Sequence, residues 1–167
     1  MNKVVIACPT LVEGDAVSND VIEQSKCLKE EGIDAHIYAQ NFDQVSSALI
    51  SQESIDYIKD NNSVLIYHHS TYWDKAPELL KNCKGRKIVK YHNITPAYFF
   101  LPYSSDCFKD AFMGRGQNRS IAEMDIDLML FDSAFNAKEF IDIGFPESKS
   151  RVLAPLPPWW CGVCGWA

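Results

Sequence analysis

The chain has 167 residues, 16 basic and 22 acidic side chains, and a formal net charge of −6 at pH 7. This length fits one domain with a sizeable core and leaves no room for a second full domain. The acidic balance argues against the clustered Lys and Arg that nucleic-acid binding requires. The Cys residues are scattered rather than crowded into a small loop-rich scaffold, so we expect reduced, structural thiols.

The N-terminus opens directly on a strand-like run at residues 4–7, without an apolar leader or a cleavage-site pattern. No apolar stretch approaches the ~20 residues that a membrane-spanning helix requires. We therefore expect a cytoplasmic protein, in which any association with a membrane would be peripheral.

Strand-like apolar runs alternate with helical patterns along the chain, which is typical of βαβ units and a parallel sheet. The fold class that this predicts is α/β: a doubly wound, mainly parallel, Rossmann-like three-layer domain. We expect the strand order 3-2-1-4-5-6, with helices on both faces. The predicted strands lie at residues 3–8, 34–39, 63–68, 87–91, 126–131 and 150–153.

Two helices have clear boundaries in the sequence. The first begins near residues 15–20, which are rich in N-capping types, and ends at Gly32. The second runs from a candidate N-cap at Ser133 to about residue 143, where Gly144 stops it. Between residues 95 and 123 prolines and glycines interrupt the pattern, so we expect short helices and loops there.

Residues 155–167, PLPPWWCGVCGWA, break the alternation, so we divide the chain into a domain at 1–154 and an irregular tail at 155–167. Cys161 and Cys164 have the CxxC spacing in this tail. One such pair supplies only half of a typical structural zinc site, and a redox motif would open a helix after a strand. The tail is therefore a weak candidate for metal or redox chemistry.

Polar residues follow two neighbouring predicted strands. His68 and His69 end the third strand, and His92 and Asn93 follow the fourth. Because ligands in open α/β sheets collect beyond the carboxyl ends of the strands, His68, His92 and Asn93 are candidate site residues. Their side chains suit hydrogen bonds to substrate hydroxyls. Neighbouring strand residues point to opposite faces, which favours a merely structural role for His69.

A metal centre is the least favoured use of these imidazoles, because no carboxylate or Cys stands at a recognisable ligand spacing around them. The loop Gly14-Asp15-Ala16, after the first strand, is a candidate anion contact because free N–H groups at a helix start attract phosphate. It is neither a GxGxxG motif nor a P-loop, and an ordinary βα turn is an equal alternative.

The region after the fourth strand is rich in aromatic residues: Tyr91, Tyr98, Phe99, Phe100 and Tyr103. Aromatic faces suit sugar rings and lipid carriers, but they suit a core equally well, so we expect most of them to pack inside. Arg115 and Arg119 are candidates for a phosphate or carboxylate contact, with simple solvation as the alternative.

The ordered series EGDAVSND, LIYHHS, KIVKYHNITPAYFF, GRGQ and DLMLFDSAFNAKEFIDIGF resembles the N-terminal half of a retaining glycosyltransferase of the GT-B fold, family 4. The resemblance covers nearly everything from residue 1 to residue 154. In that family two Rossmann-like domains face each other across a cleft. The N-terminal domain mainly holds the acceptor, and the C-terminal domain mainly holds the nucleotide-sugar donor.

The resemblance implies that Gly14, Asp15 and Ala16 face the donor diphosphate and the acceptor. It implies that His92 reaches the transferring sugar, and that Asn93 and His68 line the same cleft. Ser133 and Asn136 match the family's S-x-F-N segment, where capping explains Ser133. Retaining enzymes of this fold need no bound metal, so the resemblance implies no metal and no cofactor.

The family's donor domain, with its paired Glu motif, has no counterpart in the 167 residues. We therefore expect a truncated product, a frame-altered gene or one half of a split enzyme, inactive alone. The implied partners are a nucleotide-sugar, a glycan or lipid-linked acceptor, and a separate donor-domain chain. We also expect an apolar rim, covered in part by Trp159 and Trp160 or open to self-association.

The sequence leaves two alternatives to a glycosyltransferase domain. A noncatalytic Rossmann-like domain that binds a glycan or a partner is the alternative function. A flavodoxin-like or response-regulator-like domain is disfavoured because the first strand lacks an acidic pair at its end.

Overall fold

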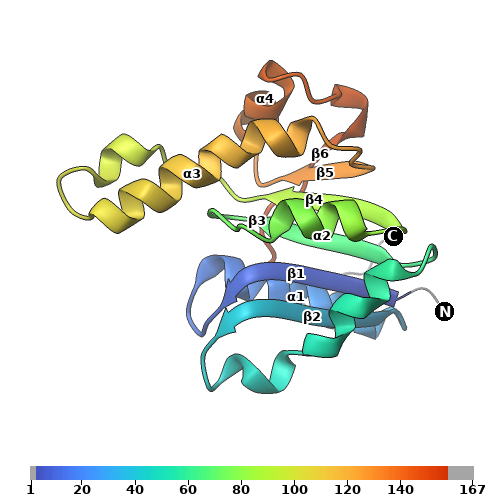
Figure 1. The fold of residues 1–167 in the computed structure, drawn as a ribbon. Coiled ribbons are helices and arrows are strands. Elements are labelled where there is room, and N and C mark those ends of the chain that lie inside the picture. The colour runs from blue at the N-terminus through green and yellow to red at the C-terminus, as the bar shows by residue number, and fades with distance from the viewer. Residues whose placement is uncertain (1–2, 158–167) are drawn as a thin grey trace.

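Six parallel strands form one sheet in the computed structural model, which describes residues 3–157 (Figure 1). This confirms the predicted doubly wound, Rossmann-like fold class. All six predicted strands are present, with ends that differ by at most a few residues. The strands are β1 (Lys3–Leu11), β2 (Asp34–Phe42), β3 (Val64–His69), β4 (Arg86–Tyr91), β5 (Leu128–Phe131) and β6 (Ser150–Val152).

Helices cover both faces of this sheet. The α-helices are α1 (Ala16–Glu30), α2 (Ala76–Asn82), α3 (Ser105–Ala122) and α4 (Ala134–Asp142). Short 3-10 helices complete the connections: η1 (Ser46–Leu49), η2 (Gln52–Lys59), η3 (Ala97–Phe100) and η4 (Glu147–Lys149). None of the helices among the described residues is both long and apolar enough to cross a lipid bilayer.

The predicted strand order 3-2-1-4-5-6 is wrong, because the observed order is β2-β1-β3-β4-β5-β6. The burial of the strands gives the physical reason. β2 alternates between buried and half-buried residues and ends exposed, as an edge strand does, whereas β3 is buried along nearly its whole length. A strand that is apolar on both faces belongs inside a parallel sheet. β3 therefore pairs with β1, and the order reverses between these two strands.

The core has one apolar cluster on each face of the sheet. On one face Val21 of α1 packs against β1, β2 and β3 side chains such as Ile6, Ile37 and Ile66. On the other face η2, α2, α3 and α4 pack against alternate residues of the inner strands, such as Val5 and Val89. Each fully buried side chain of this size contributes roughly 1.5–3 kcal/mol. The two faces are thus sealed by different helices.

The predicted boundaries of α1 and α4 are confirmed by their caps. The Asp15 carboxylate accepts a hydrogen bond from the Ser18 N–H at 2.8 Å, and Ser133 caps α4 through the Asn136 N–H. Gly32 and Gly144 follow the two helices with φ of 73° and 103°. Such positive φ angles favour glycine, which explains where both helices stop.

The expectation of short helices and loops between residues 95 and 123 is confirmed up to residue 104, where η3 lies, and is wrong beyond it, because α3 is an unbroken helix of 18 residues. Gly114 lies inside it for a packing reason. A Cβ atom at Gly114 would lie 2.9 Å from the backbone nitrogen of Tyr72, so only glycine lets the helix approach this segment. At Gly116 a Cβ atom would meet nothing within 4 Å. Glycine here marks a close approach, not a chain break.

The expectation that most aromatic residues after β4 pack inside is also wrong. Tyr91 is buried and Phe100 is partly buried, but Tyr98, Phe99 and Tyr103 are exposed. Tyr98 and Phe99 lie in η3 and Tyr103 lies in the turn before α3, in the part of the chain that projects beyond the sheet in Figure 1, so they have no layer to pack against. The predictions for the tail concern residues outside the described part of the chain: Trp159, Trp160, Cys161 and Cys164.

Candidate functional site

The reversal of strand order between β1 and β3 places a polar cluster at the carboxyl edge of the sheet. His68 is the next-to-last residue of β3, and His92 follows β4 directly. Lys90 lies two residues before His92, and the alternation of a strand places both side chains on the same face. This is the face covered by α1, which contributes Asp20. Asp20, His68 and Lys90 are fully buried, and His92 is 6% exposed.

Four polar side chains form a hydrogen-bonded chain through the cluster. His68 Nδ1 and His92 Nε2 are 2.9 Å apart. His68 Nε2 lies 3.0 Å from Gln24 Oε1, and His92 Nδ1 lies 3.1 Å from Asp132 Oδ2. The chain runs from the interior below α1 to Asp132, whose side chain is 20% exposed. It can therefore carry a change of protonation from the surface to the buried imidazole.

The proton positions in this chain follow from the acceptors. A carboxylate only accepts, so His92 Nδ1 donates to Asp132. With Gln24 Oε1 as the acceptor, His68 Nε2 donates, its Nδ1 accepts, and His92 carries protons on both nitrogens. Rotating the Gln24 amide by half a turn reverses the two inner bonds and leaves both rings neutral. Both arrangements occupy every ring nitrogen of the pair.

A buried ion pair lies beside the two imidazoles. Lys90 Nζ is 2.6 Å from Asp20 Oδ2, although neither atom has the alignment of a hydrogen bond. The same carboxylate oxygen is 3.7 Å from His68 Nδ1 and 3.6 Å from His92 Nε2. Removing one partner of such a pair strands the other charge in the interior, at a cost of about 3–5 kcal/mol.

Burial sets the protonation of His68. It lowers the pKa of this imidazole well below its ordinary value, and the neighbouring His92 and Lys90 act in the same direction. His68 is therefore neutral at pH 7 and can both donate and accept a hydrogen bond.

Asp20, His68 and His92 are also the residues that could hold a metal ion. Their ligand atoms lie within 4.8 Å of one another, and imidazole with carboxylate suits zinc. The Lys90 ammonium, however, already balances the Asp20 carboxylate at 2.6 Å. A divalent cation would lie against this ammonium, so the residues fit a charge-balanced network better than a metal centre. Ligand spacing in the sequence does not reveal this carboxylate, because Asp20 is far from His68 and His92 along the chain.

His69 points to the opposite face, as predicted. Its Nδ1 is 3.0 Å from the Tyr67 hydroxyl and its Nε2 is 2.8 Å from Asn118 Oδ1. Burial lowers its pKa to about 4, against the opposing effect of the Asn118 hydrogen bond. His69 is thus a neutral side chain inside an aromatic cluster with Tyr67, Trp73 and Tyr91.

The Gly14–Ala16 loop lies at the same edge, at the start of α1. Gly14 has φ of 80°, and the Asp15 carboxylate accepts hydrogen bonds from the N–H and the hydroxyl of Ser18, both at 2.8 Å. Ala16 is the first residue of α1, the helix that brings Asp20 to the cluster one turn later. The loop is therefore a capped βα turn on the helix that carries a cluster residue.

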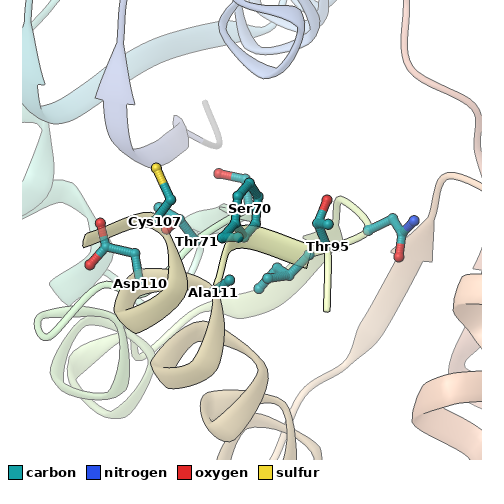
Figure 2. A pocket seen from close by; sticks show the side chains of 9 residues that line it. Ser70, Thr71, Thr95, Cys107, Asp110 and Ala111 are labelled. Carbon is teal, nitrogen blue, oxygen red and sulfur yellow. The ribbon is translucent and has the colours of Figure 1, made fainter. Parts of the chain in front are cut away.

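A pocket of about 270 Å³ opens between the carboxyl ends of β3 and β4 and the start of α3, and Figure 2 shows it from close by. Its walls come from the segments after β3 and β4 and from the first turns of α3. The lining combines hydroxyl, amide, thiol and carboxylate groups with the apolar side chains of Ile94, Phe100 and Ala111. The lining residues are Ser70, Thr71, Asn93, Ile94, Thr95, Phe100, Cys107, Asp110 and Ala111. Of the predicted site residues, Asn93 lines this pocket, whereas His68 and His92 belong to the buried cluster.

The other polar candidates have structural partners. Arg115 Nη1 donates to the Ile94 carbonyl at 2.7 Å, and its Nη2 lies 2.6 Å from Glu139 Oε1, so Arg115 makes a carboxylate contact that joins α3 to α4. Arg119 is exposed. Asn136 is buried at the start of α4, where Ser133 Oγ donates to its Oδ1 at 2.7 Å.

Sequence reasoning missed Asp20, Lys90, Gln24 and Asp132 as members of the cluster. One signal was available: Lys90 interrupts the apolar run that becomes β4, and a lysine in an inner strand needs a buried partner. Neither protein-family models nor curated proteins give a match to this chain.

Proposed function

We propose that this chain is the acceptor-binding domain of a retaining GT-B glycosyltransferase of family 4. The observation that carries the proposal is the pocket at the carboxyl ends of β3 and β4, which is lined in part by hydroxyl, amide and carboxylate groups and includes Asn93, the residue after His92. This is where an open α/β sheet binds ligands. The resemblance in sequence points to the same edge.

The lining of the pocket suits a sugar ring. Ser70, Thr71 and Thr95 offer hydroxyl groups that donate and accept, and Asn93 adds an amide. Asp110 on α3 also lines the pocket and supplies a carboxylate that can accept from two sugar hydroxyls. Phe100 provides an apolar surface for the face of a ring. The shallow form of the pocket fits one residue of a larger glycan or lipid-linked acceptor.

Transfer requires a donor as well. The described residues form one Rossmann-like domain, so under this proposal a nucleotide-sugar binds between the Gly14–Ala16 loop and a second domain, provided by a continuation of the chain or by a separate chain. Holding donor and acceptor together is worth roughly 7–11 kcal/mol of barrier lowering, so the domain alone is expected to be inactive.

His92 has a conditional role in this proposal. Both of its ring nitrogens already have partners, His68 and Asp132. To reach a transferring sugar, His92 must exchange one of these hydrogen bonds for a sugar hydroxyl. The proposal includes no metal ion and no cofactor.

The occupied ring nitrogens also favour a second candidate function. A domain that recognises a glycan or a partner without catalysis would keep the His68–His92 pair intact as a structural element. The two functions share the pocket and differ in whether His92 matters for chemistry.

Alkylation of Cys107 tests the pocket directly, because this thiol is exposed on its wall. The probes are the methyl glycosides of glucose, galactose, mannose and N-acetylglucosamine, with peptide-resolved mass spectrometry as the readout. We expect at least one glycoside to slow alkylation of Cys107. Asp110→Asn should weaken this protection, whereas Asp106→Asn should not, because Asp106 lies on the same helix but does not line the pocket.

Complementation separates the two functions. The chain is mixed with the isolated donor domain of a family 4 enzyme and a nucleotide-sugar. Transfer that depends on His92 supports the catalytic proposal. Sugar protection of Cys107 without transfer in any combination supports the noncatalytic binding domain, and absence of protection by every glycoside contradicts both.

A further inference from the structure

Asp20 has one more partner, which comes from the far end of the described chain. The backbone N–H of Leu156 donates to Asp20 Oδ1 at 2.7 Å, across 136 residues of sequence. The last sheet hydrogen bond before it joins the Leu153 N–H to the Phe131 carbonyl at 2.8 Å. Between these two points the chain leaves β6 and returns toward α1, and Figure 1 shows this passage. We call residues 153–157 the exit segment.

A hydrogen bond from the Leu156 N–H to Asp20 connects the exit segment to the cluster. Pro155 and Pro157 have no backbone N–H, so Leu156 is the only residue of these three that can donate from its backbone. The acceptor is a fully buried carboxylate, and hydrogen bonds to charged acceptors are the strong ones. The position of Leu156 therefore depends on the position of the Asp20 carboxylate.

The two oxygens of Asp20 face in two directions. Oδ1 accepts from Leu156, while Oδ2 pairs with Lys90 and lies between His68 and His92 at 3.7 and 3.6 Å. A rotation of the Asp20 carboxylate therefore changes both its hydrogen bond to Leu156 and its contact with Lys90. A movement of the imidazole pair, for example when a ligand draws His92 away from His68, is then expected to change the hydrogen bond between Asp20 and Leu156.

We propose that Asp20 is a positioning residue that couples the path of the exit segment to the His68–His92 pair. Its carboxylate holds the pair and the segment in one arrangement, so that the path of residues 153–157 follows the state of the carboxyl edge. This proposal does not depend on the glycosyltransferase function. If Asp20 were only the counterion of Lys90, the Leu156 N–H would have no influence on the imidazoles.

The first test changes the exit segment and reads the imidazoles. Leu156→Pro removes the backbone donor together with the leucine side chain, and Leu156→Ala, which removes the side chain but keeps the donor, is the matched control. The readout is the ring-nitrogen resonances of all four His in ¹⁵N NMR spectra. We expect Leu156→Pro to move the His68 and His92 resonances and to leave those of His36 and His69 in place, and Leu156→Ala to move none. Unchanged His68 and His92 in Leu156→Pro, or equal changes in both variants, would overturn the coupling.

The second test changes Asp20 and reads the exit segment. Asp20→Asn/Lys90→Met and Asp20→Ala/Lys90→Met both remove the buried charges, but only the former keeps an oxygen for Leu156. We expect the Leu156 amide hydrogen to exchange about tenfold faster in the Ala variant than in the Asn variant. Asp15→Ala, which removes the cap of the same helix, should leave Leu156 protected. Equal exchange in the two double variants would contradict the proposal.

The unmodified chain provides a measurement that does not depend on any variant folding. The Leu156 amide should exchange more slowly than an unfolded chain of the same sequence allows. Exchange at the unfolded rate would show that the hydrogen bond to Asp20 does not hold the segment, and the proposal would fail.

Discussion

His68 and His69 are adjacent in the sequence and both are fully buried, yet they belong to different chemical environments. His68 faces α1 and a network that contains the Asp20–Lys90 ion pair, His92 and Gln24. His69 faces the other side of the sheet, where Tyr67 and Asn118 satisfy its ring nitrogens without any charge. One residue along a strand separates a charged network from an aromatic core.

This difference shows which of the two imidazoles lies beside a buried ion pair. Burial lowers the pKa of both imidazoles, so neither pKa by itself marks a site. The distinction lies in the partners. On the α1 face the hydrogen bonds continue through His92 to Asp132 and lie beside the buried Asp20–Lys90 ion pair, whereas on the other face they run from Asn118 through the Tyr91 hydroxyl to Glu139. Four experiments examine this contrast, from the largest expected effect to the smallest.

Lys90→Met should cause the largest loss, because it leaves the Asp20 carboxylate buried without its counterion. We expect the free energy of unfolding to fall by about 3–5 kcal/mol, measured by urea denaturation. The double variant Asp20→Asn/Lys90→Met removes both charges and should regain most of this loss. A loss below about 1 kcal/mol in Lys90→Met would mean that no buried ion pair exists on the α1 face.

Acidification should destabilise the protein through both faces. The pKa of His69 is lowered to about 4 in the folded state, so between pH 6.5 and pH 4 the unfolded chain binds a proton that the folded chain does not. Stability is therefore lost as pH falls through this window, by roughly 3 kcal/mol from His69, with His68 acting in the same direction.

His69→Gln isolates the contribution of the aromatic face. The change in unfolding free energy between pH 7 and pH 4, measured by denaturation at each pH, should be smaller in this variant than in the unmodified chain. An identical pH dependence would show that His69 is already protonated, or not buried, in the folded protein.

Gly114 and Gly116 provide a matched pair on α3. Gly114→Ala should destabilise by about 1–3 kcal/mol, because the new Cβ meets the backbone at Tyr72 and cannot be accommodated by a side-chain rotation. Gly116→Ala meets nothing and should stabilise by up to about 1 kcal/mol through helix propensity. Thermal or urea unfolding measures both, and the same sign for the two variants would refute this packing of α3.

Asp15 and Ser133 cap helices on the two opposite faces, so their removal should have similar small effects. Asp15→Ala and Ser133→Ala are each expected to lower the unfolding free energy by about 1 kcal/mol. Urea denaturation of both variants gives the comparison. If Asp15→Ala instead raises stability, the carboxylate is held in an unfavourable position, as at a site kept for a ligand, and its capping role is secondary.

The sequence predicted the fold class and the strands well because apolar runs and helix caps are local signals. Gly32, Gly144 and Ser133 mark their helix ends without help from distant residues. The predicted strand order was wrong because the order depends on which strand is buried on both faces. The difference in burial between β2 and β3 decides this. The prediction missed α3 because Gly114 was interpreted as a chain break. Its glycine is instead required by a close contact with residues 71–72, which are distant in sequence.

The candidate site was predicted in part for the same reason. Strand ends and strand alternation correctly placed His68 and His92 together and His69 apart. Asp20 and Lys90 could not be paired from spacing, because α1 brings the carboxylate to β4 only in the folded chain. Asp110 likewise joins the pocket from α3, a helix that the sequence did not predict.

The most direct test of the proposed site is an amide NMR titration of the ¹⁵N-labelled chain with the four methyl glycosides. The account predicts that at least one glycoside shifts the amide resonances of Ser70, Thr71, Asn93 and Thr95, while those of β2 and η2 on the far side of β1 stay in place. No shift with any glycoside, or shifts that avoid the carboxyl ends of β3 and β4, would contradict the proposal that this edge binds a sugar.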